Sequence, residues 1–174
     1  MLGKMLLQVN LPRVLLPPPC VPTKERRWRK VLLNSRFPEI VKFVEKNFRT
    51  LANKKNRAIA GLSMGSFHSC NISKYYPDMF DYVGLFSGAS TGNDKSTCPV
   101  YTDFEGKLKT QFAKKPALYF IACGKTDFVY KGVADFRKLL DDNGYKYEYL
   151  ETDEGHIWRN WRIYLTEFAP KLFK

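Results

Sequence analysis

The stretch "RAIAGLSMGS", residues 57–66, sets a serine between two glycines directly after an apolar run. The apolar run predicts a short buried strand, and Gly61 and Gly65 each lie two positions from Ser63. A serine at a strand-to-helix turn of this kind predicts a nucleophile elbow, in which the turn lifts the hydroxyl clear of the backbone. The glycines at 61 and 65 are expected to remove side chains that would clash across this turn. The alternative is a glycine-rich connection without chemistry, and the rest of the chain has to separate the two.

The size and composition indicate one packed domain. The chain has 174 residues, of which 44% are hydrophobic and 15% aromatic, enough for a single hydrophobic core. No apolar run approaches the roughly 20 residues that span a bilayer, so we expect no membrane partner. The start of the chain also lacks the pattern of a signal peptide.

The positive charge is concentrated at the beginning of the chain. Eight Lys or Arg and a single acid fall within residues 1–36, which therefore carry +7 of the net +12. The densest segment is "KERRWRK", residues 24–30. It could hold nucleic acid or an acidic polymer, but it belongs to no recognisable nucleic-acid module. We therefore predict an irregular basic leader over residues 1–30, and nucleic acid is not an expected partner.

The four cysteines have spacings unsuited to a metal site. Cys20, Cys70, Cys98 and Cys123 form no C-x-x-C pair, so zinc is not expected. Cys70 and Cys123 fall in a predicted helix and at the end of a predicted buried strand. We therefore predict free, buried thiols.

Strands and helices alternate from residue 37 onward. Apolar runs predict strands at residues 57–62, 82–88, 117–124 and 145–151. Helices are predicted at residues 37–51, 66–76, 104–114, 131–142 and from 158 onward. The first helix is expected to bury Ile40, Phe43, Val44, Phe48 and Leu51, and the last to bury Trp158, Trp161, Leu165, Phe168 and Leu172. Apolar strands alternating with helices predict an α/β fold, a parallel sheet with helices on both faces.

A serine nucleophile needs a base, and the chain offers two histidines. His68 lies five residues into the helix that follows Ser63, on a side from which its ring does not readily reach the hydroxyl. His156 lies in "DEGHIW", a loop after the fourth strand, where parallel sheets gather catalytic groups. We therefore predict His156 as the base and His68 as a packing or surface residue.

The carboxylate that orients the base is predicted to be Asp127. It stands in "CGKTDFVY", directly after the third strand, and gives the chain order Ser, Asp, His of an α/β-hydrolase. Asp153 and Glu154 are the alternatives, but they share the loop of His156 and are less able to support the ring from behind.

Four segments carry a family resemblance: "NRAIAGLSMG", "YYPDMFDYVGLFSGA", "IACGKTDF" and "GHIWRNWRIYLTEFAPKLF". They closely resemble the esterase D-like branch of the α/β-hydrolases, carbohydrate esterase family 1. This family includes feruloyl esterases, acetyl xylan esterases and the esterase domains attached to xylanases. The resemblance runs from residue 37 to residue 174, and it implies that residues 31–174 form the C-terminal part of an α/β-hydrolase domain.

The resemblance also implies a mechanism and a substrate class. Acyl transfer to Ser63 would proceed without cofactor or metal, with His156 shuttling protons, Asp127 orienting it and the Met64 amide in the oxyanion hole. Substrates would be feruloyl or acetyl esters of plant cell-wall xylan, cleaved by a secreted or periplasmic protein. Trp158 is either a wall of the acyl pocket or part of the buried stripe of the last helix.

Departures from the family leave three questions open. No H-G-type loop, the family's second oxyanion donor, is found upstream of Ser63, and the chain resembles a truncated member whose early strands are missing. Residues 57–62 would then form an open apolar edge prone to self-association, unless part of "MLLQVNLPRVLL", residues 5–16, covers it. An impaired esterase remnant, a thioesterase for a glutathione-type substrate and a basic binding protein remain alternatives.

Overall fold

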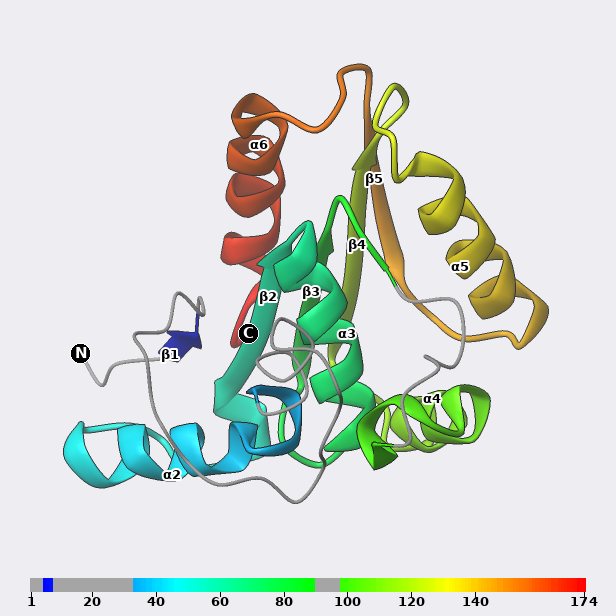
Figure 1. Ribbon diagram of the computed structural model, residues 1–174. Coiled ribbons are helices and arrows are strands. Elements are labelled where there is room, and N and C mark those ends of the chain that lie inside the picture. Colours follow the sequence, from blue (N-terminus) through cyan, green and yellow to red (C-terminus); the bar gives the residue numbers. More distant parts are fainter. Residues whose placement is uncertain (1–4, 8–32, 90–97) are drawn as a thin grey trace.

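The computed structural model describes residues 5–7, 33–89 and 98–174. Its centre is a parallel sheet of five strands in the order β1-β2-β3-β4-β5 (Figure 1). The strands are β1 (Met5–Leu7), β2 (Arg57–Leu62), β3 (Tyr82–Phe86), β4 (Leu118–Gly124) and β5 (Glu148–Thr152). The helices are α2 (Phe37–Asn47), α3 (Met64–Tyr75), α4 (Phe104–Ala113), α5 (Tyr130–Asp142) and α6 (Trp158–Phe168). The predicted α/β class is confirmed, and each predicted strand is present.

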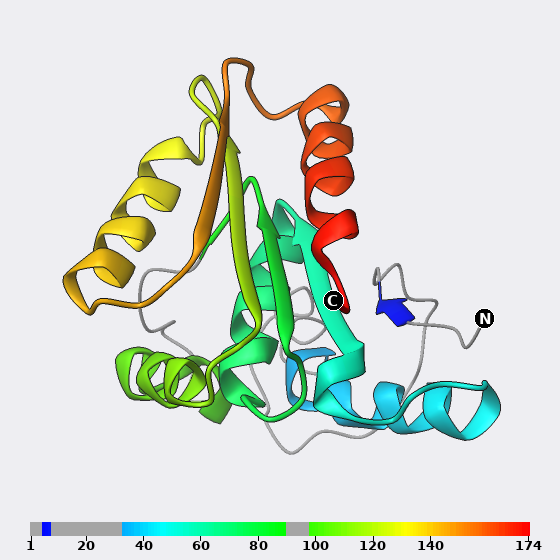
Figure 2. The same ribbon diagram turned by 180° about the vertical axis from the view of Figure 1, so that it is seen from behind.

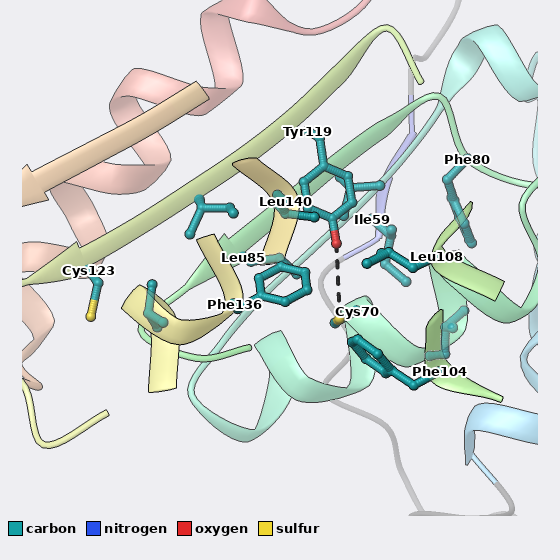
Figure 3. Packing of buried hydrophobic residues seen from close by; sticks show 14 of the residues in the cluster. Ile59, Cys70, Phe80, Leu85, Phe104, Leu108, Tyr119, Cys123, Phe136 and Leu140 are labelled. Atoms are coloured by element: carbon teal, nitrogen blue, oxygen red, sulfur yellow. Dashed lines mark hydrogen bonds between the residues drawn. The ribbon is translucent and has the colours of Figure 1, made fainter. Parts of the chain in front are cut away.

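Helices cover both faces of the sheet, as the apolar strands require. On one face, residues of β2, β3 and β4 pack against α3, α4, α5 and the start of α2 (Figure 2). The close view of this cluster shows Ile59, Leu85 and Tyr119 among side chains of α3, α4 and α5 (Figure 3). On the other face, the intervening strand residues pack against Tyr164 and Phe168 of α6. The two clusters therefore follow the two-residue period of the strands.

The predicted inward face of α2 is partly wrong. Phe37 and Val41 are buried, whereas Phe43 and Phe48 are exposed. The helix ends at Asn47, so Phe48 lies beyond it. The buried stripe runs through Phe37 and Val41, and Ile40 packs against the same cluster, so the prediction is right for Ile40 and wrong for Phe43.

The predicted inward face of α6 is also partly wrong. The buried residues are Asn160, Tyr164 and Phe168, while Trp158 is 67% exposed and Leu165 is exposed as well. Asn160 donates to the Gly155 carbonyl at 2.8 Å, and the Tyr164 hydroxyl bonds Thr152 Oγ1 at 2.8 Å. Because these hydrogen bonds satisfy their polar atoms, an asparagine and a tyrosine can occupy core positions.

The edge of β2 is partly covered. Three residues of β1 pair in parallel with residues 57–59 of β2, so the expectation that the segment 5–16 covers this edge is confirmed for residues 5–7. In the described part of the chain, residues 60–62 have a strand partner only on the β3 side. Self-association through this edge stays a prediction, and the rest of the leader predicted over residues 1–30 lies outside the described residues.

The turn after β2 depends on a close contact between two glycines. A Cβ atom on Gly61 would lie 2.2 Å from both the carbonyl carbon and the oxygen of Gly65, whereas a Cβ on Gly65 would meet nothing within 4 Å. The prediction that both glycines avoid side-chain clashes is therefore right for Gly61 and wrong for Gly65. What matters at Gly65 is its backbone, which occupies the place that a side chain on residue 61 would need.

Gly61→Ala should therefore cost about 3 kcal/mol of unfolding free energy, because the new methyl group forces strand and helix apart. Gly132→Ala is the matched control, since Gly132 lies in α5 with nothing within 4 Å of a new Cβ; it should gain roughly 0.5–1 kcal/mol. Urea unfolding of the two variants measures both values. Equal stability of the two variants would contradict the contact.

A lysine is buried on the inner side of α3. Lys74 is 1% exposed. Its ammonium group donates to Asn71 Oδ1 at 2.5 Å and lies 4.0 Å from the centroid of the Phe104 ring. Burial lowers the pKa of Lys74 to about 8, from 10.5. Between these two values the unfolded chain binds more protons than the folded one, so the stability contributed by this site rises with pH.

Lys74→Met should stabilise the protein at pH 7 by about 3 kcal/mol, because it removes a charge whose burial is unfavourable. The gain should shrink to about half at pH 9.5, where the folded lysine has lost its proton. Urea unfolding at both pH values tests this, with Lys131→Met on the surface of α5 as the control. A gain for Lys74→Met that does not change with pH would contradict the interpretation.

Candidate active site

Ser63 occupies the turn between β2 and α3 in a strained conformation. Its φ is 53° and its ψ is −117°, a region that residues other than glycine rarely adopt. The backbone is held in place by a hydrogen bond from the Ser63 N–H to the Phe86 carbonyl at 2.8 Å. Strain retained at a fixed turn is the geometry of a nucleophile elbow, and the glycine-rich connection without chemistry does not require it.

The end of β3 supports the same turn. Ser66, in the first turn of α3, is buried and donates its hydroxyl to the Gly88 carbonyl. A Cβ on Gly88 would lie 2.9 Å from the Ser63 carbonyl oxygen. The elbow is therefore packed tightly against the residues that follow β3.

Met64 is the first residue of α3. Its N–H is one of the N-terminal amides that have no acceptor within a helix, and it stands next to the Ser63 side chain at the positive end of the helix dipole. An oxyanion formed on a substrate at Ser63 could accept a hydrogen bond from it. The sequence shows no loop upstream of Ser63 for a second donor, and residues 8–32 lie outside the described residues.

His156 and Asp127 form a hydrogen-bonded pair at the carboxyl ends of β4 and β5. The His156 Nδ1 atom lies 3.0 Å from both Oδ1 and Oδ2 of Asp127. The Asp127 side chain is fully buried, and its Oδ1 also accepts the Val129 N–H at 3.1 Å. A proton on Nδ1 would be donated to the carboxylate, which leaves Nε2 available as the base.

The loop that carries His156 is fixed by close packing against the end of β4. A Cβ on Gly124 would lie 1.6 Å from the Glu154 carbonyl oxygen. The Lys125 N–H donates to the Thr152 carbonyl at 2.8 Å, and Asn160 of α6 holds the Gly155 carbonyl. The position of the imidazole is therefore set by strand ends and by α6 together.

The two alternative carboxylates have other partners. Asp153 is 90% exposed at its side chain and accepts from Lys125 Nζ at 2.9 Å. Glu154 accepts from Arg159 at 2.7 Å. Asp127 is thus the carboxylate that the structure places against the His156 ring.

The other histidine, His68, contacts residues away from the Asp127–His156 pair. His68 Nδ1 lies 2.8 Å from Asn34 Oδ1, and its ring contacts Phe67 edge-on at 6.1 Å. This is the packing role predicted for it.

Ser63 and His156 are connected through the end of β3 and α6. No hydrogen bond joins their side chains among the described residues, although such contacts are often long before substrate binds. The Ser63 N–H donates to the carbonyl of Phe86, the residue before Ser87. Ser87 Oγ accepts a hydrogen bond from Trp161 Nε1 at 3.1 Å. The Trp161 ring in turn lies 5.0 Å from the His156 ring.

Two aromatic residues, Phe128 and Trp161, contact the His156 ring. Neither was predicted as part of the site. The Phe128 ring centroid is 4.5 Å from that of His156, and the side chain is 78% exposed. Trp161 was assigned only to a buried stripe. The available signal was the position of Phe128 directly after Asp127, on the same strand-end loop.

Comparison with known proteins identifies the family. The sequence profile of the family described as "Putative esterase" matches residues 20–118, more than half of the chain. The chain belongs to this esterase family. An endo-1,4-beta-xylanase/feruloyl esterase of Xylanibacter ruminicola is 33% identical over 148 residues, which cover 84% of this chain and 18% of the relative. An acetyl esterase of Caldicellulosiruptor saccharolyticus is 24% identical, over 73% of this chain and 58% of that protein.

Solved structures show that this family member has the fold of α/β-hydrolase esterases. A CE1 ferulic acid esterase from Anaeromyces mucronatus, in complex with ferulic acid, superposes with a TM-score of 0.71 at 22% identity, over 90% of this chain and 61% of that one. An S-formylglutathione hydrolase from Staphylococcus aureus gives 0.63 at 21% identity, over 80% and 60%. The chain therefore spans less than two thirds of the length of each of these relatives.

Two further properties bear on the chemistry of this esterase-family chain. Across residues 5–7, 33–89 and 98–174, no group of three or more His, Cys, Asp or Glu could hold a metal ion. In the same residues, no helix has the length and apolar character needed to cross a bilayer. The thiols of Cys70 and Cys123 are free and buried, as predicted. Cys98 is buried as well, and Cys20 lies outside the described residues.

Proposed function

We propose that this chain is a serine carboxylic ester hydrolase that cleaves feruloyl or acetyl esters of plant cell-wall xylan. The observation that carries the proposal is the strained Ser63 elbow on the same edge of the sheet as the Asp127–His156 pair. The carboxyl ends of parallel strands bring these groups to one edge. The names of the relatives, a xylanase/feruloyl esterase and an acetyl esterase, support the choice of substrate.

The proposed reaction begins with attack by Ser63 Oγ on the ester carbonyl carbon. His156 Nε2 takes the hydroxyl proton, and the Met64 N–H donates to the oxygen that becomes negative. The C–O bond to the sugar then breaks, His156 returns the proton to the sugar oxygen, and the acyl group stays on Ser63. Water, deprotonated by His156, then attacks the acyl carbon. As the bond to Ser63 Oγ breaks, His156 returns this proton to Ser63 Oγ and the acid is released. Asp127 holds the imidazole with its proton on Nδ1 throughout.

The rim of the site favours an acyl group that offers apolar surface. Trp158 contacts Trp161, the neighbour of His156, edge-on at 5.1 Å. Trp158 and Phe128 are both exposed. Since its side chain is not buried in the core of α6, Trp158 is proposed as a substrate-binding residue. Polysaccharide substrates of this kind accord with a secreted or periplasmic protein. Residues 31–174 are proposed to form the esterase domain, preceded by a basic leader.

Ser63→Ala and His156→Gln should each lower kcat for p-nitrophenyl acetate and methyl ferulate by about 10⁴-fold or more, because nucleophile and base act as a unit. His68→Gln is the matched control, since it changes the other histidine of the chain, and it should leave kcat within about twofold. Initial rates of the purified variants at pH 7 measure both effects.

The same assay separates the alternatives. Wild-type hydrolysis of S-formylglutathione but not of either ester would favour the thioesterase. A folded wild-type protein that hydrolyses none of the three would indicate an impaired remnant. Equal activity of wild type and Ser63→Ala would refute the proposed nucleophile.

A further inference from the structure

A second strained serine lies beside the first. Ser87 follows β3 with a φ of 50°, is fully buried, and donates its N–H to the Ala122 carbonyl of β4 at 2.8 Å. Ser63 follows the neighbouring strand, and its N–H is held by the residue before Ser87. Two serines in the left-handed region therefore occupy adjacent strand ends, and only the first has a role in the proposed mechanism.

The Ser87 hydroxyl anchors Trp161. The indole N–H can only donate, so Ser87 Oγ is the acceptor of their 3.1 Å hydrogen bond. On the same side of the sheet, burial raises the pKa of Tyr164, whose hydroxyl bonds Thr152 Oγ1 at 2.8 Å. The Ser87–Trp161 hydrogen bond thus lies on a face of the sheet whose buried side chains are mostly apolar.

Trp161 supplies the His156 ring with an anchored contact. The two rings are nearly perpendicular, at 87°, with centroids 5.0 Å apart. In the described part of the chain, the hydrogen bonds of the His156 side chain are those from Nδ1 to Asp127, which leaves the ring able to tilt about that atom. Phe128 also contacts the ring, but its side chain is mostly exposed. Trp161 is the neighbour whose own position is fixed by a hydrogen bond to the sheet.

We propose that Trp161, anchored by Ser87, is a positioning residue that keeps the His156 ring aimed at Ser63. Two consecutive residues of one strand end carry both partners: the Phe86 carbonyl holds the Ser63 backbone, and the Ser87 hydroxyl holds Trp161 against His156. The separation of nucleophile and base is therefore set by the end of β3. The catalytic consequence rests on the proposed function, whereas the positioning of the ring does not.

The decisive variant is Trp161→Phe, which keeps an aromatic ring and removes the N–H. Because the chain has two histidines, spectra of the protein labelled at histidine with nitrogen-15 show His156 with His68 as an internal reference. The ring signals of His156 should shift or broaden while those of His68 stay unchanged. With ester substrates, kcat should fall about threefold to tenfold at nearly constant KM, the effect expected for loss of one hydrogen bond that positions the base.

Two further variants separate positioning from a general loss of stability. Tyr119→Phe removes a buried hydroxyl that contacts Cys70 Sγ on the opposite face of the sheet; it should lower Tm without moving the His156 signals. Ser87→Ala should reproduce the effect of Trp161→Phe, and the double variant should add little to either, since both changes break one interaction.

The His156 signals test the positioning role of Trp161 whether or not the protein hydrolyses esters. This role is overturned if Trp161→Phe lowers Tm but leaves the His156 signals where they are in wild type, or if the effects of Ser87→Ala and Trp161→Phe are fully additive. A wild-type protein that hydrolyses no ester would refute the proposed function alone. The His156 signals of that inactive protein would still test the positioning role.

Discussion

The approach of Gly61 to the backbone of Gly65 is the constraint on which the site depends. Because residue 61 has no Cβ, the backbone of Gly65 can pack directly against it. This close approach lets α3 start immediately after β2, with Ser63 at a positive φ between them. The strain at Ser63 is maintained by surrounding contacts, namely the Phe86 carbonyl and the Ser66–Gly88 hydrogen bond. The same turn places the Met64 amide at the start of the helix, so the proposed nucleophile and the proposed oxyanion donor are positioned together.

The parallel sheet brings the other groups to this turn. Asp127 follows β4 and His156 follows β5, and the Gly124–Glu154 approach fixes the histidine loop against the end of β4. The end of β3 lies between the elbow and β4, and through Ser87 it reaches Trp161 and the imidazole. Strand ends, rather than long loops, therefore set the geometry of the site, which is how a short chain can assemble three groups from distant parts of its sequence.

The sequence predicted the strands well because their apolar runs require burial on both faces. It also placed Asp127 and His156 on adjacent strand-end loops, where the structure pairs them. The faces of α2 and α6 were less predictable. On α6, Asn160 and Tyr164 are buried because Gly155 and Thr152 satisfy their polar atoms, and no periodicity of apolar residues can reveal such partners. The roles of Ser87 and Trp161 depend on one side-chain hydrogen bond across 74 residues, for which the sequence carries no local signal.

The central claim is that Ser63, His156 and Asp127 act at one point, and a crystal structure of the protein treated with an alkyl fluorophosphonate tests it most directly. The account predicts phosphorus bonded to Ser63 Oγ, a phosphonyl oxygen near the Met64 N–H, and His156 Nε2 about 3 Å from an oxygen of the adduct, within hydrogen-bond reach. An intact fold in which the phosphonate is bonded to another residue, or in which the His156 ring is turned away from the adduct, would contradict it.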